Sequence, residues 1–309
     1  MPDGPASDHD GYDVIGDVHG CCRQLLDLLV GLGYSNESGA FRHPSRQVIF
    51  VGDLIDRGPQ QVQVIRTVRA MVDAGTAQVV MGNHEFNAIA YATPDPGRSG
   101  EHLRPHTEKN NGQHAAFLAQ IGAGSADHAE AVAWFATLPL WLDLGELRVV
   151  HACWDPHAMA GLGTPFVDDE VMVNASTQDH AAYGWVENLC KGPEVRLPDG
   201  LSFLDKDGHE RFDARFRWWD PLATTYDRAY EVPDGSTLPD APLERPPVEP
   251  YHDHIPVIFG HYWRKWPNLD LTTTTACVDY SAVKGGPLVA YRWTGEPELR
   301  PDHLFPSRK

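Results

Sequence analysis

Three short motifs in the first third of the sequence combine carboxylate, amide and imidazole groups in patterns that suit metal binding. They are GDVHG at residues 16–20, GDLIDRG at residues 52–58 and GNHE at residues 82–85. A single Gly-Asp pair is most often a turn, and a single Asp-X-His is most often a coincidence. Three such motifs in order, each after a short apolar run, indicate a metal-dependent site.

The chemistry that fits these residues is hydrolysis of a phosphate ester by two metal ions. Two ions about 3.5–4 Å apart lower the pKa of a bound water and clamp the oxygens of the transferring phosphate. The predicted reaction is direct attack on phosphorus by a metal-bound hydroxide. Mixed nitrogen and oxygen ligands suit divalent or trivalent Mn, Fe, Zn or Ni better than Ca, and Mn is our first choice. The predicted ligands are Asp17, His19, Asp53 as the bridging carboxylate, Asn83, His151 and His261.

The remaining polar residues of the motifs are predicted to act on the substrate. His84 directly follows Asn83 and should point toward the leaving group, where a protonated imidazole would be a general acid. Asp56 or Glu85 could hold that imidazole charged and oriented. Arg57 can donate two parallel hydrogen bonds to a phosphate. We therefore predict that Arg57 and Asn83 contact the substrate.

Other residues of reactive type are expected to be structural. Cys22 and Cys153 lie beside the predicted metal loops, but a buried small side chain is the simpler interpretation. Trp218 and Trp219 are expected in the core or a pocket wall. Six histidines outside the motifs are also expected to have structural roles: His106, His114, His157, His180, His252 and His254. On spacing alone, the arginines before the tryptophan pair form a solvent-exposed face: Arg211, Arg215 and Arg217.

The motifs must be positioned by strands that alternate with helices. Apolar or β-branched runs at residues 13–15, 47–51, 78–81, 147–150 and 255–259 each end at a polar motif. Leucines from Leu25 to Leu32 share one face of a predicted helix, Ile65 to Val72 share another, and a third helix is predicted over residues 129–138. This alternation predicts a parallel or mixed sheet covered by helices, with ligands bound where the strands end.

The segment of residues 154–254 breaks this alternation. Prolines are dense between Val232 and Pro250, at Pro233, Pro239, Pro242, Pro246, Pro247 and Pro250. Such density favours an extended loop over helix or strand. We therefore expect residues 1–309 to form a single domain in which residues 154–254 are a loop-rich insertion over the active site.

Composition limits the cellular setting and the partners. The formal net charge is −18, which disfavours binding to nucleic acid. No apolar run is long enough for a membrane helix, and the acidic start of the sequence, with no Lys or Arg before Arg23, argues against a secretion signal. Five scattered cysteines suggest reduced thiols and a cytoplasmic protein. Nothing in the sequence indicates an oligomeric state.

The three motifs, together with His151 and His261, resemble the calcineurin-like metallophosphoesterases. The forms GDLIDRG and GNHE are similar to the phosphoprotein phosphatase branch, which includes bacterial and phage Ser/Thr phosphatases and symmetrical diadenosine tetraphosphatases. Residues 138–140 and 218–221 (WWDP) are also similar to that branch. Ala152-Cys153, where relatives usually have glycines, and the proline-dense segment depart from it.

The resemblance implies an αββα sandwich of mixed sheets flanked by helices. It places Asp17, His19 and Asp53 at one metal, and Asp53, Asn83, His151 and His261 at the other. It also implies that His84 and Asp56 are the acid pair, that Arg57 binds phosphate, and that a second phosphate-binding arginine precedes the Trp-Trp-Asp segment. Arg217 is the first candidate for that arginine, and Arg215 is the second.

The leading functional hypothesis is a metal-dependent phosphatase for phosphate monoesters, on phosphoproteins or small molecules. The alternative enzyme is a hydrolase of dinucleoside polyphosphates such as diadenosine tetraphosphate. A metal-binding scaffold without activity is the hypothesis from another class. The presence of Asp56, Arg57 and His84 argues against it, because a degenerate site would be expected to lose them.

Overall fold

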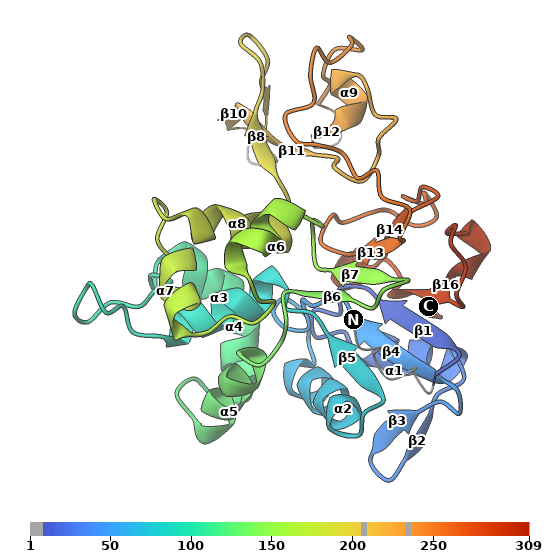
Figure 1. Cartoon of the computed structure of the whole chain (residues 1–309). Helices are drawn as coiled ribbons and strands as arrows, with labels where there is room; N and C mark the ends of the chain where they lie inside the picture. The colour runs from blue at the N-terminus through green and yellow to red at the C-terminus, as the bar shows by residue number, and fades with distance from the viewer. Residues whose placement is uncertain (1–8, 205–208, 233–235, 309) are drawn as a thin grey trace.

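The computed structural model of the chain describes residues 9–204, 209–232 and 236–308. The larger of its two central sheets has the strand order β16-β15-β1-β4-β5 (Figure 1). β1, β4 and β5 run parallel, whereas β15 is antiparallel to β1 and β16 is antiparallel to β15. The strands are β1 (Gly11–Ile15), β4 (Arg46–Phe50), β5 (Ala77–Val79), β15 (Val289–Trp293) and β16 (Leu304–Pro306).

The second central sheet has the order β14-β13-β7-β6. β13 is parallel to both β14 and β7, and β6 is antiparallel to β7. The strands are β6 (Trp141–Asp143), β7 (Arg148–Val150), β13 (Val257–Phe259) and β14 (Thr275–Cys277).

The two sheets pack face to face, and the alternation of side chains along their strands explains why. Ile49 of β4, Val149 of β7 and Ile258 of β13 belong to one buried cluster between the sheets. Their neighbours Phe50 and Phe259 point the other way, into a second cluster that also holds the apolar faces of the helices. The central strands β4 and β13 are therefore buried on both faces, as in an αββα sandwich, which confirms the predicted fold class.

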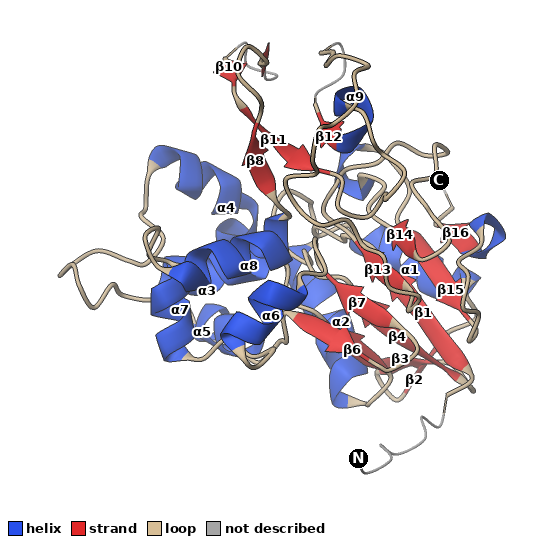
Figure 2. Cartoon of the chain, turned by 45° about the horizontal axis from the view of Figure 1, so that its top comes forward, coloured by secondary structure: helices blue, strands red, loops and turns tan. Residues whose placement is uncertain are grey.

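Helices cover the outer faces of the sheets (Figure 2). Thr107 and Ser125 cap α4 and α5 by accepting a backbone hydrogen bond. The helix predicted over residues 129–138 is α5, which lies three residues earlier because Ser125 provides its cap. The helices before residue 140 are α1 (Cys22–Gly31), α2 (Gln61–Asp73), α3 (Asn83–Ala92), α4 (Glu108–Ile121) and α5 (Ala126–Phe135).

The region of residues 154–254 is more regular at its start than the sequence analysis expected. It opens with three helices, α6 (Pro156–Leu162), α7 (Asp169–Ala175) and α8 (Ala181–Lys191). A three-stranded sheet follows, made of β8 (Glu194–Arg196), β11 (Asp213–Phe216) and β12 (Tyr230–Glu231). The same region also contains a two-stranded sheet of β9 (Phe203–Leu204) and β10 (Glu210–Arg211), and the short helix α9 (Tyr226–Ala229).

Irregular chain does follow in the proline-dense segment. Residues 236–250 contain no helix or strand, only an isolated bridge from Pro242 to Thr225. Pro233 and the acidic residues Asp3 and Asp8 lie outside the described residues. The smaller elements of the rest of the chain are β2 (Ser35–Glu37), β3 (Ala40–Arg42) and the 3₁₀ turns η1 (Ala282–Lys284) and η2 (Pro301–His303). Over the described ranges, no helix combines the length and apolar character that crossing a membrane requires.

Candidate metal centre

The predicted metal ligands meet where parallel strands of the two sheets end. β1 leads to Asp17 and His19, and its parallel neighbour β4 leads to Asp53. β7 leads directly to His151, and its parallel neighbour β13 leads to His261. All five side chains are buried, although their charges and ring nitrogens would be better solvated in water. Burial of so many ionisable groups requires partners that compensate for the lost water.

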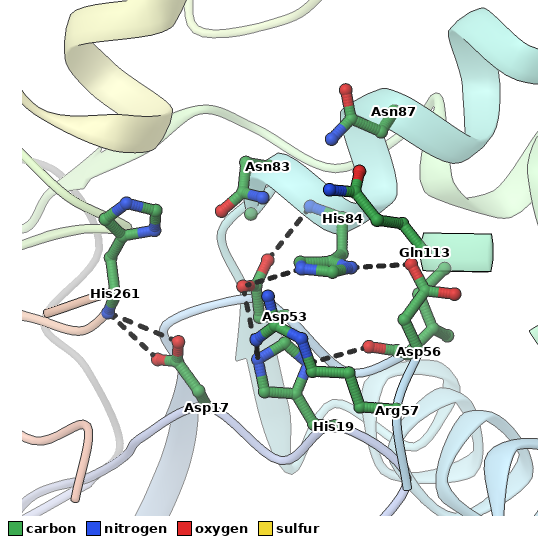
Figure 3. A network of polar contacts seen from close by, with 12 residues as sticks. Asp17, His19, Asp53, Asp56, Arg57, Asn83, His84, Asn87, Gln113 and His261 are labelled. Atoms are coloured by element: carbon green, nitrogen blue, oxygen red, sulfur yellow. Dashed lines mark hydrogen bonds and ion pairs between the residues drawn. The ribbon is translucent and has the colours of Figure 1, made fainter. Parts of the chain in front are cut away.

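Asp53 is at the centre of this site, and its two oxygens face different histidines (Figure 3). Oδ2 lies 3.5 Å from Nε2 of His19 and 3.9 Å from Nε2 of His84. Oδ1 lies 3.5 Å from Nε2 of His151. The side chains therefore form two groups that could each hold a metal ion. The first group is His19, Asp53 and His84, and the second is Asp53, His151 and His261. A carboxylate shared in this way has the geometry of a bridge between two ions.

The ring nitrogens of these histidines are arranged for metal binding. Nδ1 of His19 bonds to the carbonyl of Ile55 at 2.8 Å, and Nδ1 of His151 bonds to the carbonyl of Val51 at 2.7 Å. These bonds leave each Nε2 directed at the site, which is the usual outer support of a metal-bound imidazole. Burial lowers the pKa of His19 to about 3, so its ring is neutral and able to donate a lone pair.

His261 gives the clearest sign that a cation fits here. Its Nε2 is buried and has no hydrogen-bond partner among the described residues. Burial lowers the pKa of His261 well below its ordinary value, so the ring is neutral and Nε2 can carry its lone pair. A buried polar atom without a partner is rare in folded proteins, and a metal ion would satisfy it. The residues present therefore fit a metal centre.

Asp17 and Asn83 lie beside the two groups in different ways. Both carboxylate oxygens of Asp17 accept the backbone N–H of His261, at 3.2 Å each, and Asp17 belongs to neither group. Burial, with Asp279 and Asp53 nearby, raises the pKa of Asp17 well above its usual range. Oδ1 of Asn83 lies 3.2 Å from Nε2 of His151, which places its amide at the second group.

The partner of His84 is Asp56. Nδ1 of His84 lies 2.5 Å from Oδ2 of Asp56, and the other oxygen of Asp56 lies 2.8 Å from Nδ1 of His114. Burial opposes a charge on His84, but Asp53 and the hydrogen-bonded Asp56 outweigh burial and raise its pKa. Glu85, the other partner that the sequence allows, instead accepts three backbone N–H groups, from Asp53, Leu54 and Gly82. Glu85 thus holds the second and third motifs together.

Arg57 reaches over the first group of ligands. Its Nη1 lies 2.8 Å from Nε2 of His19, and its guanidinium lies 4.3 Å from the centre of the Trp263 ring. Trp263 was not singled out by the sequence analysis, and it follows β13 by four residues. A planar guanidinium stacked on an aromatic ring keeps its donors free at the edges, where a phosphate could bind.

The backbone at the site is strained in an informative way. The non-glycine residues with positive φ include several of the predicted site residues, namely His19, Asp53, Asp56, Arg57 and His261. Each such conformation costs about 1–3 kcal/mol and persists only where the surroundings enforce it. Gly82 allows close approach as well, because a Cβ there would collide with Oδ1 and the backbone N of Asp53. The chain therefore holds these side chains in one arrangement.

A cavity of about 390 Å³ opens above the metal-binding groups, and we call it the catalytic cavity. Four of the predicted site residues line it: Asp53, Asn83, His84 and His261. Five cationic side chains line it: Arg57, Arg104, Lys109, Lys191 and Arg215.

The two candidates for a second phosphate arginine lie in different places. Arg215, on β11, lines the catalytic cavity. Arg217, the first candidate, is placed elsewhere, because it forms ion pairs at 3.1 Å with Glu231 and with Asp270. Arg215 lies on β11 and Arg217 directly follows that strand, so only the folded structure shows which of them reaches the cavity.

Several functional candidates escaped the sequence analysis. Arg104, Lys109 and Lys191 come from the loop before α4, from α4 itself and from the end of α8. None has a motif around it, so only the three-dimensional structure shows them together. Asp279, by contrast, is a buried carboxylate two residues after β14. Asp17 and Asp53 were selected because each is an acidic residue just after a strand. The same criterion would have selected Asp279.

Comparisons with known proteins identify the family of the chain. The family model for calcineurin-like phosphoesterases matches residues 12–298. The asymmetrical bis(5'-nucleosyl)-tetraphosphatase PrpE of Bacillus subtilis is 34% identical over 149 residues, which are 46% of this chain and 57% of that protein. PrpE of Halalkalibacterium halodurans is 51% identical over 74 residues, 24% of this chain and 30% of that protein. The matches therefore span less than two thirds of these curated relatives.

Solved structures with a similar arrangement include a serine/threonine phosphatase from Saccharomyces cerevisiae. It is 14% identical, with a TM-score of 0.49 over 98% of this chain and 80% of that chain. A cold-active protein-tyrosine phosphatase from Shewanella is 15% identical, with a TM-score of 0.47 over 100% of this chain and 83% of that chain. Because the family model matches nearly the whole sequence, the chain belongs to the calcineurin-like phosphoesterase family, whose members use a dimetal centre.

Proposed function

We propose that this chain is a metal-dependent hydrolase of dinucleoside polyphosphates such as diadenosine tetraphosphate. This reverses the order given by the sequence analysis, which placed phosphate monoesters first. The observation that carries the proposal is the concentration of unpaired cations in the catalytic cavity. The curated relatives named as bis(5'-nucleosyl)-tetraphosphatases support the same choice.

The catalytic cavity holds more positive charge than one phosphate group would need. None of Arg57, Arg104, Lys109 and Arg215 forms an ion pair with an Asp or Glu in the described part of the chain. The whole chain nevertheless carries a net charge of −18. Like charges gathered without acidic partners repel each other, so they are favourable only when an anion fills the space between them.

A polyphosphate chain matches this arrangement because each internal phosphate carries a negative charge. Arg104 shows how the cavity is prepared for it. Its Nη1 donates to Oδ1 of Asn87 and its Nη2 donates to Oε1 of Gln113, both at 2.7 Å. Neutral amides thus fix the guanidinium without cancelling its charge. Figure 3 shows Asn87 and Gln113 beside His84, at the edge of the metal-binding groups.

The residues of the site divide the work of hydrolysis between them. When bound, two metal ions would supply an activated water and offset the negative charge of the phosphate under attack. Arg57 binds oxygens of that phosphate and orients it. As the bond from water to phosphorus forms and the bond to the leaving oxygen breaks, His84 gives a proton from Nε2 to that oxygen. Asp56 holds His84 at Nδ1 and keeps it protonated until then.

We extend the proposal to the metal and the cellular compartment. The neutral imidazoles, carboxylates and amide of the site support Mn as the native metal, with Fe, Zn or Ni as substitutes. All five cysteines, Cys21, Cys22, Cys153, Cys190 and Cys277, are buried free thiols, which supports a reducing compartment such as the cytoplasm.

The test is a comparison of substrates with the purified, Mn-loaded protein. Diadenosine tetraphosphate, a phosphoserine peptide and p-nitrophenyl phosphate are compared by kcat/KM. The proposal expects diadenosine tetraphosphate to be preferred over both monoesters. It also expects ATP and AMP as products, because the relatives are named as asymmetrical enzymes. A phosphopeptide preferred over diadenosine tetraphosphate would restore the order of the sequence analysis.

A further inference from the structure

A second cavity, of about 660 Å³, adjoins the catalytic cavity, and we call it the distal cavity. Its walls come from α3, from the loop between α3 and α4, and from the segment that joins α7 to α8. Figures 1 and 2 show α7 and α8 beside α3. Four residues line both cavities, namely Asn87, Arg104, Asn110 and Lys191. The two spaces therefore share a boundary, and a ligand longer than one phosphate can occupy both.

We infer that the distal cavity binds one nucleoside of the substrate while the catalytic cavity holds its phosphates. This inference rests on the proposed function. It goes beyond that function by assigning a binding site to residues that neither the motifs nor the metal centre includes. The volume of the distal cavity lies within the range of small-molecule sites.

The change in charge between the two cavities supports a boundary between phosphate and nucleoside. In the distal cavity, apart from Arg104 at the shared boundary, the cations have acidic partners. Arg98 pairs with Asp95 at 2.7 Å, and Lys191, at the shared boundary, pairs with Glu187. The catalytic cavity instead holds four cations without such partners. The anionic part of a ligand is favoured on one side of the boundary, and an uncharged part is favoured on the other.

The lining of the distal cavity offers groups suited to a base and a ribose. Phe86 and Tyr183 provide aromatic surface, and the side chain of Gln178 hydrogen-bonds to Tyr183. Thr177 adds a hydroxyl at an exposed position. Aromatic rings stack on bases of any kind, and amides and hydroxyls bind the edges of bases and sugars.

Ser176 adds a second, independent indication of a ligand. Ser176 lines the distal cavity, and its Oγ is buried without a hydrogen-bond partner within the described residues. A buried hydroxyl without a partner costs free energy that a ligand can recover by hydrogen bonding. A nucleoside has donors and acceptors on both the ribose and the base, so it can supply that bond.

Two inhibitors that differ only by a nucleoside test the inference. ATP and inorganic tripolyphosphate are compared as inhibitors of p-nitrophenyl phosphate hydrolysis by the Mn-loaded protein. Thr177→Trp places a bulky ring in the distal cavity from an exposed position, and Tyr183→Ala removes an aromatic wall. We expect wild type to bind ATP more tightly than tripolyphosphate. The ratio of the inhibition constant of ATP to that of tripolyphosphate should rise about tenfold or more in each variant.

The matched control is Ala129→Trp, which places the same ring in a cavity beside α5 that shares no residue with the other two. Its ratio should equal that of wild type. Equal inhibition of wild type by ATP and tripolyphosphate, or an unchanged ratio in both distal-cavity variants, would overturn the inference. Failure of the proposed function looks different, because it would appear as weak turnover of diadenosine tetraphosphate by wild type.

Discussion

Nδ1 of His114 lies 2.8 Å from Oδ1 of Asp56, while the other oxygen of that carboxylate meets His84. Asp56 is therefore held at both oxygens, and all three side chains are buried. On its sequence context, His114 is expected to have a structural role. Because it contacts the residue that orients the proposed general acid, we propose that His114 is a positioning residue for the reaction.

Removal of the His114 contact should weaken proton donation by His84. We expect His114→Leu to lower kcat by about tenfold, the effect of losing one hydrogen bond to a charged group. The loss should be larger for phenyl phosphate than for p-nitrophenyl phosphate, because the poorer leaving group needs the proton more. His157→Leu, at an exposed histidine, is the control. Equal losses on the two esters would show that His114 only stabilises the fold.

Substitution of His84 separates its two possible tasks. Its Nε2 lies 3.9 Å from Oδ2 of Asp53, close enough to one metal-binding group to be a ligand. If it is the general acid, His84→Asn should keep both metals and lower kcat by about 10²–10⁴-fold on phenyl phosphate. The metal content is measured by elemental analysis, and kcat is measured with both phenyl phosphate and p-nitrophenyl phosphate. Loss of one metal ion would instead assign His84 as a ligand.

The proposed bridging role of Asp53 predicts a joint loss of metals. Asp53→Asn weakens the charge that both metal-binding groups share, so we expect both ions and the activity to be lost together. His261→Ala changes one group only, and it should retain more metal than Asp53→Asn. Because bound metal stabilises the folded state, chelation should lower the Tm of wild type more than that of Asp53→Asn. Normal metal content in Asp53→Asn contradicts the bridge.

Arg104 should matter for long phosphate chains and little for single phosphates. Arg104→Gln removes a positive charge that forms no ion pair with a carboxylate in the described chain. We expect KM for diadenosine tetraphosphate to rise about tenfold, with a smaller change for p-nitrophenyl phosphate. Arg69→Gln, at a surface arginine paired with Glu130, is the control. A similar rise for both substrates would mean that Arg104 contacts only the phosphate under attack.

His128 should make the fold sensitive to mild acid. Burial, with a smaller contribution from His114, lowers the pKa of His128 below its ordinary 6.5. As the pH falls below 6.5, the unfolded chain binds a proton that the folded chain does not, so stability falls until the folded pKa is reached. In His128→Leu the free energy of unfolding should fall less between neutral pH and about pH 5. Urea unfolding at each pH measures this free energy. A decrease in His128→Leu as large as in wild type would contradict the assignment of the acid sensitivity to His128.

The sequence could predict the centre of the candidate site because its proposed ligands lie close to strand ends. Asp17, Asp53 and His151 each follow an apolar run within two residues or so, and parallel strands bring their ends to one edge. The fold class followed from the same alternation of strands and helices. The helices α6 and α7 were missed because helices of seven residues carry too little periodicity to stand out.

Contacts between distant segments could not be predicted. The residues alone left both Asp56 and Glu85 open as partners for His84, although the family resemblance implied Asp56, and only the folded chain shows Glu85 bound to backbone N–H groups. The choice between Arg215 and Arg217 depended on how β11 lies against the cavity. The cations from α4 and α8 gather through tertiary packing alone, so the case for a polyphosphate substrate required the structure.

The most direct test of the central claim is the kcat/KM of the Mn-loaded wild-type protein for diadenosine tetraphosphate, measured beside that for a phosphoserine peptide. The unpaired cations of the catalytic cavity predict that the dinucleotide is preferred, by on the order of tenfold or more. A phosphopeptide turned over as efficiently as diadenosine tetraphosphate, or better, would contradict the claim.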